Sequence, residues 1–253
     1  MTAKSSDLRV RTLSAAVMAA VSGLALWLGG PVWIAFVCTL AVAVLWEWVR
    51  LSRAGASSPA ERGLWNFAGM FYVGTCAAML LFLRNPAFTP APLLTVICGV
   101  IAVDVCAYFT GRTFGGPKIA PAISPSKTWS GLVGGIAGAT LVLFGAAVLW
   151  RAGAISVSPE GSGADAGVCF GMRPCWYLDA GLVPLFATCL LTGIIFAICA
   201  QAGDFFESWM KRRAGVKDSG NLIPGHGGFF DRVDGLLAVL FVLGLMILFQ
   251  PGL

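Results

Sequence analysis

The sequence predicts an all-α integral membrane protein that crosses the bilayer about seven times. Of its 253 residues, 58% are hydrophobic and only 11% are charged, and the mean hydropathy is +0.84. An ordinary soluble domain carries about 25% charged residues. This composition excludes a soluble enzyme, a disordered tail and a nucleic-acid-binding module, and no nucleic-acid partner is expected. What it favours is a set of apolar helices of about 20 residues, the length that crosses a bilayer core.

Seven apolar runs have this length, and each is expected to form one span: 12–30, 32–49, 64–83, 91–110, 131–150, 180–200 and 233–251. We divide the chain into N-terminal helices, 1–90, and a C-terminal catalytic part, 91–253, with polar loops 111–130 and 201–234. Small residues spaced by four in the fifth run predict close helix packing, either within a protomer or at a dimer interface. They are Gly131, Gly134, Gly135 and Gly138.

The basic residues predict the orientation, because cytoplasmic loops are enriched in Lys and Arg. With the N-terminus inside, 14 of the 17 basic residues fall on the inner side, and Arg84, Arg151 and Arg173 remain outside. The sequence therefore predicts a cytoplasmic N-terminus. Cys169 and Cys175 lie in the same predicted outer loop. They can form a disulfide or remain two free thiols, and the sequence does not decide between these alternatives.

Half of the twelve acidic residues gather at the inner ends of three predicted spans or in the last inner loop: Asp104, Asp204, Glu207, Asp218, Asp231 and Asp234. Ionisable residues in membrane segments are functional candidates, because a carboxylate facing lipid is costly. Crowded carboxylates repel unless a cation neutralises them, and all-oxygen ligands suit Mg²⁺. Glu47, at the inner end of the second span, is expected to pair with Arg50 or Arg53.

Basic residues lie beside these acids, in the loops after the fourth and sixth spans. Carboxylates, a divalent cation and basic side chains together are the equipment of phosphoryl or nucleotidyl transfer. Gly225, Gly227 and Gly228 flank His226, and glycines let backbone N–H groups approach a phosphate closely.

Plainer interpretations of these charges stay open. The basic loops can serve only to fix topology and contact anionic headgroups. Asp231 and Asp234 can stabilise a helix N-terminus. Asp204 can pair with Lys211 across two turns of one helix.

The last inner loop carries a dense pattern of polar residues. Ser208, Lys211, Arg212, Lys217 and Asp218 precede Pro224-Gly225-His226-Gly227-Gly228, which Asp231, Arg232 and Asp234 follow. This pattern resembles the signature of the phosphatidate cytidylyltransferase family. Two further stretches are similar to that family: Asp104-x-x-Ala107-Tyr108-x-x-Gly111-Arg112 and Ser124-Pro125-x-Lys127-Thr128. Ser130 stands where the family usually has glutamate.

The resemblance implies transfer of the cytidylyl group of CTP to phosphatidic acid, which gives CDP-diacylglycerol and pyrophosphate. It implies Mg²⁺ and a second cation such as K⁺, with Asp204, Asp231 and Asp234 as metal ligands; these three, with Asp218 and Lys217, form the implied catalytic set. Contacts to CTP or lipid phosphate are implied for Asp104, Tyr108, Arg112, Ser124, Lys127, Thr128, Ser208, Lys211, Arg212, His226, Gly227, Gly228 and Arg232.

The expected location is the inner (plasma) membrane, with the active site on the cytoplasmic face and membrane lipid around the helices. A homodimer is left open. Two other functions also stay open: a CTP-dependent polyprenol kinase and a membrane transporter. Against transport, the acids gather at one face of the membrane, and the sequence contains no visible inverted repeat.

Overall fold

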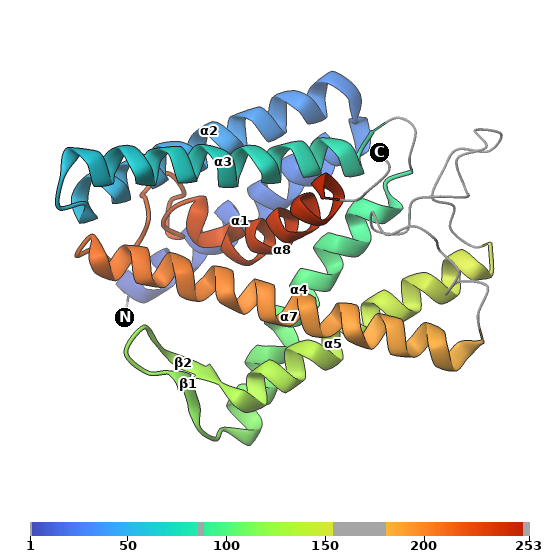
Figure 1. Cartoon of the computed structure of the whole chain (residues 1–253). Helices are drawn as coiled ribbons and strands as arrows, with labels where there is room; N and C mark the ends of the chain where they lie inside the picture. The colour runs from blue at the N-terminus through green and yellow to red at the C-terminus, as the bar shows by residue number, and fades with distance from the viewer. Residues whose placement is uncertain (1, 86–88, 154–180, 250–253) are drawn as a thin grey trace. The chain divides into compact units, whose positions relative to one another are not determined.

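The computed structural model describes residues 2–85, 89–153 and 181–249, which are mostly helical (Figure 1). The helices are α1 (Thr2–Leu28), α2 (Gly30–Gly55), α3 (Pro59–Leu83), α4 (Ala91–Phe114), α5 (Trp129–Arg151), α7 (Leu182–Arg213) and α8 (Phe230–Leu248). Each predicted span overlaps one of these helices, so the expected all-α membrane fold is confirmed. Cys169 and Cys175 lie outside the described residues.

Six of the described helices, α1 to α5 and α7, are long and apolar enough to cross a membrane. α8 is also apolar over most of its length, but Asp231, Arg232 and Asp234 stand within its first five positions. Charges of this kind are costly where a helix faces lipid. The seventh span and the cytoplasmic N-terminus therefore stay predictions.

A short antiparallel hairpin, which the sequence analysis treated as loop, connects α4 to α5. Its strands are β1 (Lys118–Ala120) and β2 (Ser124–Thr128), with Lys118 opposite Thr128 and Ala120 opposite Ser124. The hairpin ends where Thr128 caps α5, because the Thr128 hydroxyl accepts a hydrogen bond from the Gly131 amide at 3.1 Å. The strand residues are therefore held in a fixed register next to α5.

The helices form two compact units. The first unit comprises Met1–Leu81 and Phe206–Asp234, and the second comprises Phe82–Phe205 and Gly235–Leu253. Most of the loop 201–234 groups with the N-terminal helices, and the division of the chain at residue 90 stays a prediction.

Trp48 is the centre of the first unit. Only 2% of its surface is exposed, and its indole N–H donates to the Trp65 carbonyl oxygen at 2.8 Å. A side chain at Gly69 would overlap the Trp48 ring, so the glycine lets α3 approach α2 closely. Four further rings surround the indole, with centroids within 6.4 Å: Trp65, Tyr72, Phe206 and Phe230. This cluster holds Phe230, the first residue of α8, and Phe206 of α7 in place.

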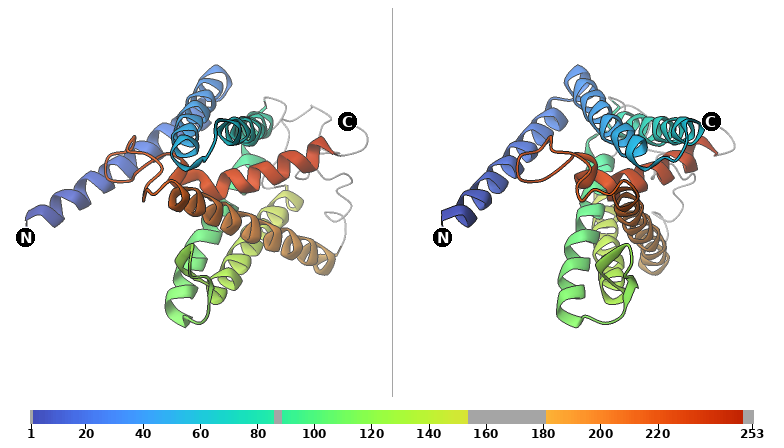
Figure 2. Two further views of the ribbon diagram at one scale, coloured as in Figure 1. Left: turned by 60° about the vertical axis from the view of Figure 1, so that its left-hand side comes forward. Right: turned by 90° about the vertical axis from the view of Figure 1, so that its left-hand side faces the viewer.

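In the second unit, α5 packs against α4 through its glycines, and both views of Figure 2 show these two helices side by side. A side chain at Gly134 would overlap Thr110, and one at Gly138 would contact Cys106 and the Ala102 carbonyl. The predicted close packing is thus confirmed within the chain, where it serves the contact between α4 and α5.

Replacing Gly134 by Val is therefore expected to destabilise the protein by about 1–3 kcal/mol, the usual cost of overpacking a close contact. Gly145→Val is the matched control, because it lies on the same helix and a β-carbon there meets nothing within 4 Å. The measurement is the thermal unfolding midpoint of both variants in detergent. Equal midpoints would contradict the packing role of Gly134.

Candidate active site

The loop between α7 and α8 carries most of the predicted site residues and belongs to the first unit. It folds back on itself at a tight turn, where the Ile223 amide donates to the Gly227 carbonyl at 2.9 Å and the His226 amide donates to the Ile223 carbonyl at 3.0 Å. Gly225 and Gly227 adopt φ of 76° and 85°, a conformation that residues with a β-carbon rarely adopt. The turn brings the glycine run next to the start of α8.

Asp231, in the first turn of α8, is the most highly connected carboxylate of this loop. Its Oδ2 accepts the Gly228 amide at 2.8 Å, the Ser219 amide at 2.9 Å and the Ser219 hydroxyl at 3.0 Å. Its side chain is only 5% exposed. Burial raises the pKa of Asp231, but hydrogen bonds with Glu207, Lys211 and the Gly228 amide and the charge of Lys211 outweigh it, so the pKa lies well below its ordinary value. Asp231 is therefore ionised at neutral pH.

Lys211 joins two of the predicted acids. Its Nζ lies 2.8 Å from Oδ1 of Asp231 and 2.6 Å from Oε2 of Glu207, one helical turn earlier on α7. Asp231 also has the helix-terminal role considered for it, because it accepts the amide of Gly228 three residues earlier.

Glu47, from α2, is fully buried beneath the loop. Its carboxylate accepts the Phe229 amide at 2.9 Å, the Phe230 amide at 2.8 Å and the Ser219 hydroxyl at 2.7 Å. The expected pairing of Glu47 with Arg50 or Arg53 is therefore wrong. Arg50 instead donates from Nη2 to the Ser219 carbonyl at 2.9 Å. Glu47 satisfies two otherwise unpaired N–H groups at the start of α8, so α2 holds the loop in place.

Glycines make this arrangement possible, because the two carboxylates lie directly against the loop backbone. A β-carbon at Gly220 or Gly228 would overlap the Glu47 carboxylate. One at Gly227 would come within 2.8 Å of Oδ2 of Asp231 and 3.4 Å of Cβ of Asp218. Gly227 and Gly228, which follow His226, thus allow close approach to carboxylates of the protein itself.

His226 connects the glycine run to α1. Its Nδ1 lies 2.8 Å from the Ser14 hydroxyl, and its carbonyl oxygen accepts hydrogen bonds from Nε and Nη2 of Arg232 at 3.2 and 2.9 Å. Figure 2 shows the loop reaching the N-terminal half of α1 in both views. Of the other predicted loop residues, Ser208 and Asp234 are half-buried, whereas Arg212, Lys217 and Asp218 are exposed.

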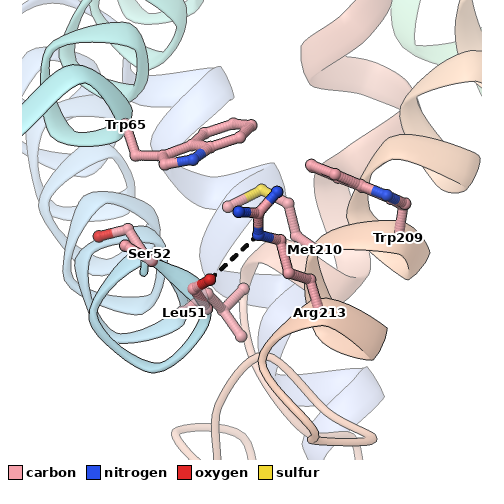
Figure 3. A pocket seen from close by; sticks show the side chains of 8 residues that line it. Leu51, Ser52, Trp65, Trp209, Met210 and Arg213 are labelled. Atoms are coloured by element: carbon pink, nitrogen blue, oxygen red, sulfur yellow. Dashed lines mark hydrogen bonds between the residues drawn. The ribbon is translucent and has the colours of Figure 1, made fainter. Parts of the chain in front are cut away.

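Arg213 anchors the end of α7. Figure 3 shows its guanidinium near Trp65 and Trp209, with a hydrogen bond from Nε to the Gly55 carbonyl at 3.0 Å. It also pairs with Glu61 and lies over the Trp209 ring, 5.5 Å from the ring centroid. The remaining cavity measures only about 10 Å³, too little room for a substrate. Arg213 therefore secures the helix turn that carries Lys211.

The second unit brings together the other predicted residues. Lys127, on β2, forms an ion pair with Asp204 of α7, and the charges of both act on Asp104 of α4. The alternative pairing of Asp204 with Lys211 is thus replaced by a pair with the hairpin. Ser124 lies on β2, with its hydroxyl 3.4 Å from that of Ser126.

Polar residues at the end of α4 and the start of α5 form hydrogen bonds with nearby residues. Nη1 of Arg112 donates to the Tyr108 hydroxyl at 2.8 Å, one turn back on α4. Ser130, at the position where glutamate was expected, donates to the Gly115 carbonyl and lies 3.1 Å from the Thr128 hydroxyl. The serine thus ties the end of α4 to the start of α5.

The predicted metal ligands are divided between the units: Asp204 belongs to the second, Asp231 and Asp234 to the first. Within residues 2–85, 89–153 and 181–249, no group of three or more His, Cys, Asp or Glu side chains is arranged to hold a metal ion. Two observations still fit a cation. The Lys211 ammonium contacts both Glu207 and Asp231, so this pair of carboxyl groups already attracts a cationic group, and the buried Oε1 of Glu207 accepts no hydrogen bond from any described residue.

Sequence reasoning missed Glu47 and Ser219 as parts of the site. Glu47 lies more than 170 positions from the residues it binds, so no local spacing reveals the contact. One signal was present, because a carboxylate inside an apolar helix needs hydrogen-bond donors. Ser219 follows Asp218 directly and was passed over as a loop residue.

Comparison with known proteins identifies the family of the chain. Residues 55–250 match the sequence model of the cytidylyltransferase family. The chain is 32% identical to a phosphatidate cytidylyltransferase of Brucella suis, over 94% of this chain and 92% of that protein. It is also 32% identical to one of Rickettsia bellii, over 92% and 87%, and 30% identical to one of Rickettsia conorii, over 95% and 91%. The chain therefore belongs to the cytidylyltransferase family.

Proposed function

We propose that this chain transfers the cytidylyl group of CTP to phosphatidic acid, which forms CDP-diacylglycerol and releases pyrophosphate. The observation that carries the proposal is the Asp231–Lys211–Glu207 cluster beside a glycine-rich turn, in a chain whose relatives are named phosphatidate cytidylyltransferases. A loop that brings the ionised Asp231 together with several basic side chains, at the end of membrane helices, suits a reaction between a nucleotide and a lipid phosphate.

In the proposed reaction an oxygen of the lipid phosphate attacks the α-phosphorus of CTP. The new O–P bond forms as the bond between the α-phosphorus and the bridging oxygen breaks, and pyrophosphate leaves with the electron pair. The attacking phosphate is already anionic, so no covalent enzyme intermediate is needed. Lys127, Lys211, Arg212 and Lys217 provide positive charge for the triphosphate and the lipid phosphate.

For the cofactor we propose Mg²⁺, with K⁺ as a candidate second cation. Asp231 and Asp234 of the first unit, with Asp218 nearby, are the proposed ligands, and Asp204 stays a predicted one. The support is chemical: these are oxygen donors, and Asp231 already binds a cationic group. Bound Mg²⁺ supplies charge neutralisation for the triphosphate and the leaving pyrophosphate. Lys211, whose Nζ lies 2.8 Å from Asp231, would then serve the phosphate oxygens.

The helices make the chain an integral membrane protein, and we propose the inner membrane with the site on its cytoplasmic face. Support comes from the distribution of basic residues, of which 14 of 17 fall on the inner side when the N-terminus is inside. With this orientation the proposed active-site residues would face the cytoplasm, the side on which CTP is available.

The decisive experiment supplies purified protein with CTP, Mg²⁺ and phosphatidic acid and identifies both products. Equal amounts of pyrophosphate and CDP-diacylglycerol are expected. Release of CDP with a phosphorylated lipid would replace the proposal by a lipid kinase, and turnover with no lipid tested would return transport as the leading function.

Removal of divalent metal is expected to reduce this activity by at least about a hundredfold, because the triphosphate then keeps its full charge. The measurement is pyrophosphate release after excess EDTA, followed by addition of Mg²⁺ to restore it. A protein that keeps full activity in EDTA would rule out the metal proposal. Adding Mg²⁺ with and without K⁺ tests the second cation.

A further inference from the structure

An apolar groove lies in the first unit between α1, α2 and the start of α8. Its volume is about 510 Å³, within the range of small-molecule sites. The walls are apolar side chains such as Val17 and Val21 of α1, Phe36 and Leu40 of α2, and Val233 of α8. Among the described residues that line it, Arg232 alone carries a charge.

Arg232 gives the groove a cationic end. Two of its guanidinium nitrogens, Nε and Nη2, donate to the His226 carbonyl, and the residue is exposed. This contact orients the guanidinium while leaving Nη1 for a further acceptor. Arginine binds phosphate well, because its planar group presents several N–H donors at once.

The cationic end of the groove and its apolar part follow one another along α1. Ser14 contacts His226 near the cationic end, and Val17 and Val21 line the groove beyond it. At 1.5 Å per residue, Ser14 and Val21 lie about 10 Å apart along the helix axis. A ligand with an anionic head and an apolar chain matches this order.

We propose that this groove seats one acyl chain of the phosphatidic acid acceptor while Arg232 contacts its phosphate. The proposal rests on the proposed function and specifies which surface selects the lipid. Charge complementarity favours a phospholipid over a second protein helix, because a purely apolar helix face has no negative group to pair with Arg232. Lipid tails are already in an apolar medium, so the groove discriminates by shape and by the phosphate contact.

A bulky residue in the groove tests the proposal. Ala19→Phe adds a ring to a lining position, and Ala20→Phe adds the same ring to an exposed neighbour on α1 that does not line the groove. The KM for dipalmitoyl phosphatidate is expected to rise about tenfold in Ala19→Phe and to stay within twofold in Ala20→Phe. The KM for CTP stays unchanged, and the KM for dihexanoyl phosphatidate, whose chains are short, rises less than threefold. Equal lipid KM values in the two variants would overturn the proposal.

A binding measurement separates this proposal from the proposed function. Phosphatidate carrying a diazirine at the chain end is photo-crosslinked to the wild-type protein, and the labelled peptides are identified by mass spectrometry. Labelling of α1 and α2 that excess phosphatidate abolishes and phosphatidylcholine does not abolish supports the groove, even if no CDP-lipid forms. Labelling that both lipids reduce equally, or that lies on other helices, overturns the groove even in an active enzyme.

Discussion

Asp234→Asn is expected to lower the turnover of CTP by at least about a thousandfold while the protein still folds. The residue is the fifth of α8, three positions after Asp231, and is half-buried. The substitution removes a charge at almost unchanged volume, so a large loss of rate reports lost stabilisation of charge in the reaction. The measurement is kcat for CDP-diacylglycerol formation, with size-exclusion elution and thermal unfolding in detergent as checks of folding.

Asp7→Asn is the matched control for this variant, because it makes the same chemical change outside the motif. It is expected to retain wild-type turnover. Wild-type turnover by Asp234→Asn would remove that residue from the proposed metal ligands. Raising the Mg²⁺ concentration separates a weakened metal site from a lost one, because only a weakened site regains activity.

Glu47→Ala is expected to disorder the loop between α7 and α8 and to abolish activity. The substitution leaves the Phe229 and Phe230 amides without their acceptor, whereas the Ser219 hydroxyl keeps Asp231 as a partner. A buried donor left unpaired costs about 1–3 kcal/mol, so the loss of both bonds is expected to free the start of α8 and the loop before it. The measurement is tryptic cleavage at Arg212 and Lys217, which is expected to accelerate strongly relative to wild type.

Two further variants show whether Glu47 positions the loop through its charge. Glu47→Gln keeps the volume but directs an amide N–H₂ toward donors, so its activity is expected to fall almost as far as that of Glu47→Ala. Glu61→Gln, at a more exposed acid that pairs with Arg213, is expected to stay near wild type. Normal cleavage and activity in Glu47→Gln would show that the carboxylate charge is unnecessary.

The helices were predictable from the sequence because each needs only its own apolar length, as 91–110 within α4 shows. How the predicted site residues are divided between the two units was not predictable. The four-residue spacing of Glu207 and Lys211 is enough to explain their contact on one face of α7, but no spacing shows that Lys211 also reaches Asp231, twenty positions later, across the loop.

Hydropathy gave no signal for the hairpin either. Strand β2 contains Pro125 and two serines, which are typical of a loop. It forms a strand only because it pairs with β1. Lys127 was identified as a candidate from the motif alone, and its partner Asp204 became visible only in the folded unit. Contacts between distant segments depend on packing, which single-sequence patterns do not encode.

The buried Glu47 has a consequence for biogenesis. Chains are synthesised from the N-terminus, so α2 enters the membrane long before α8 leaves the ribosome. Until then the carboxylate of Glu47 lacks the amides of Phe229 and Phe230 that bind it in the finished protein. An unpaired carboxylate in a membrane helix is costly, so α2 stays in a higher-energy state until α8 is made. Formation of the active-site loop is thereby coupled to the synthesis of α8.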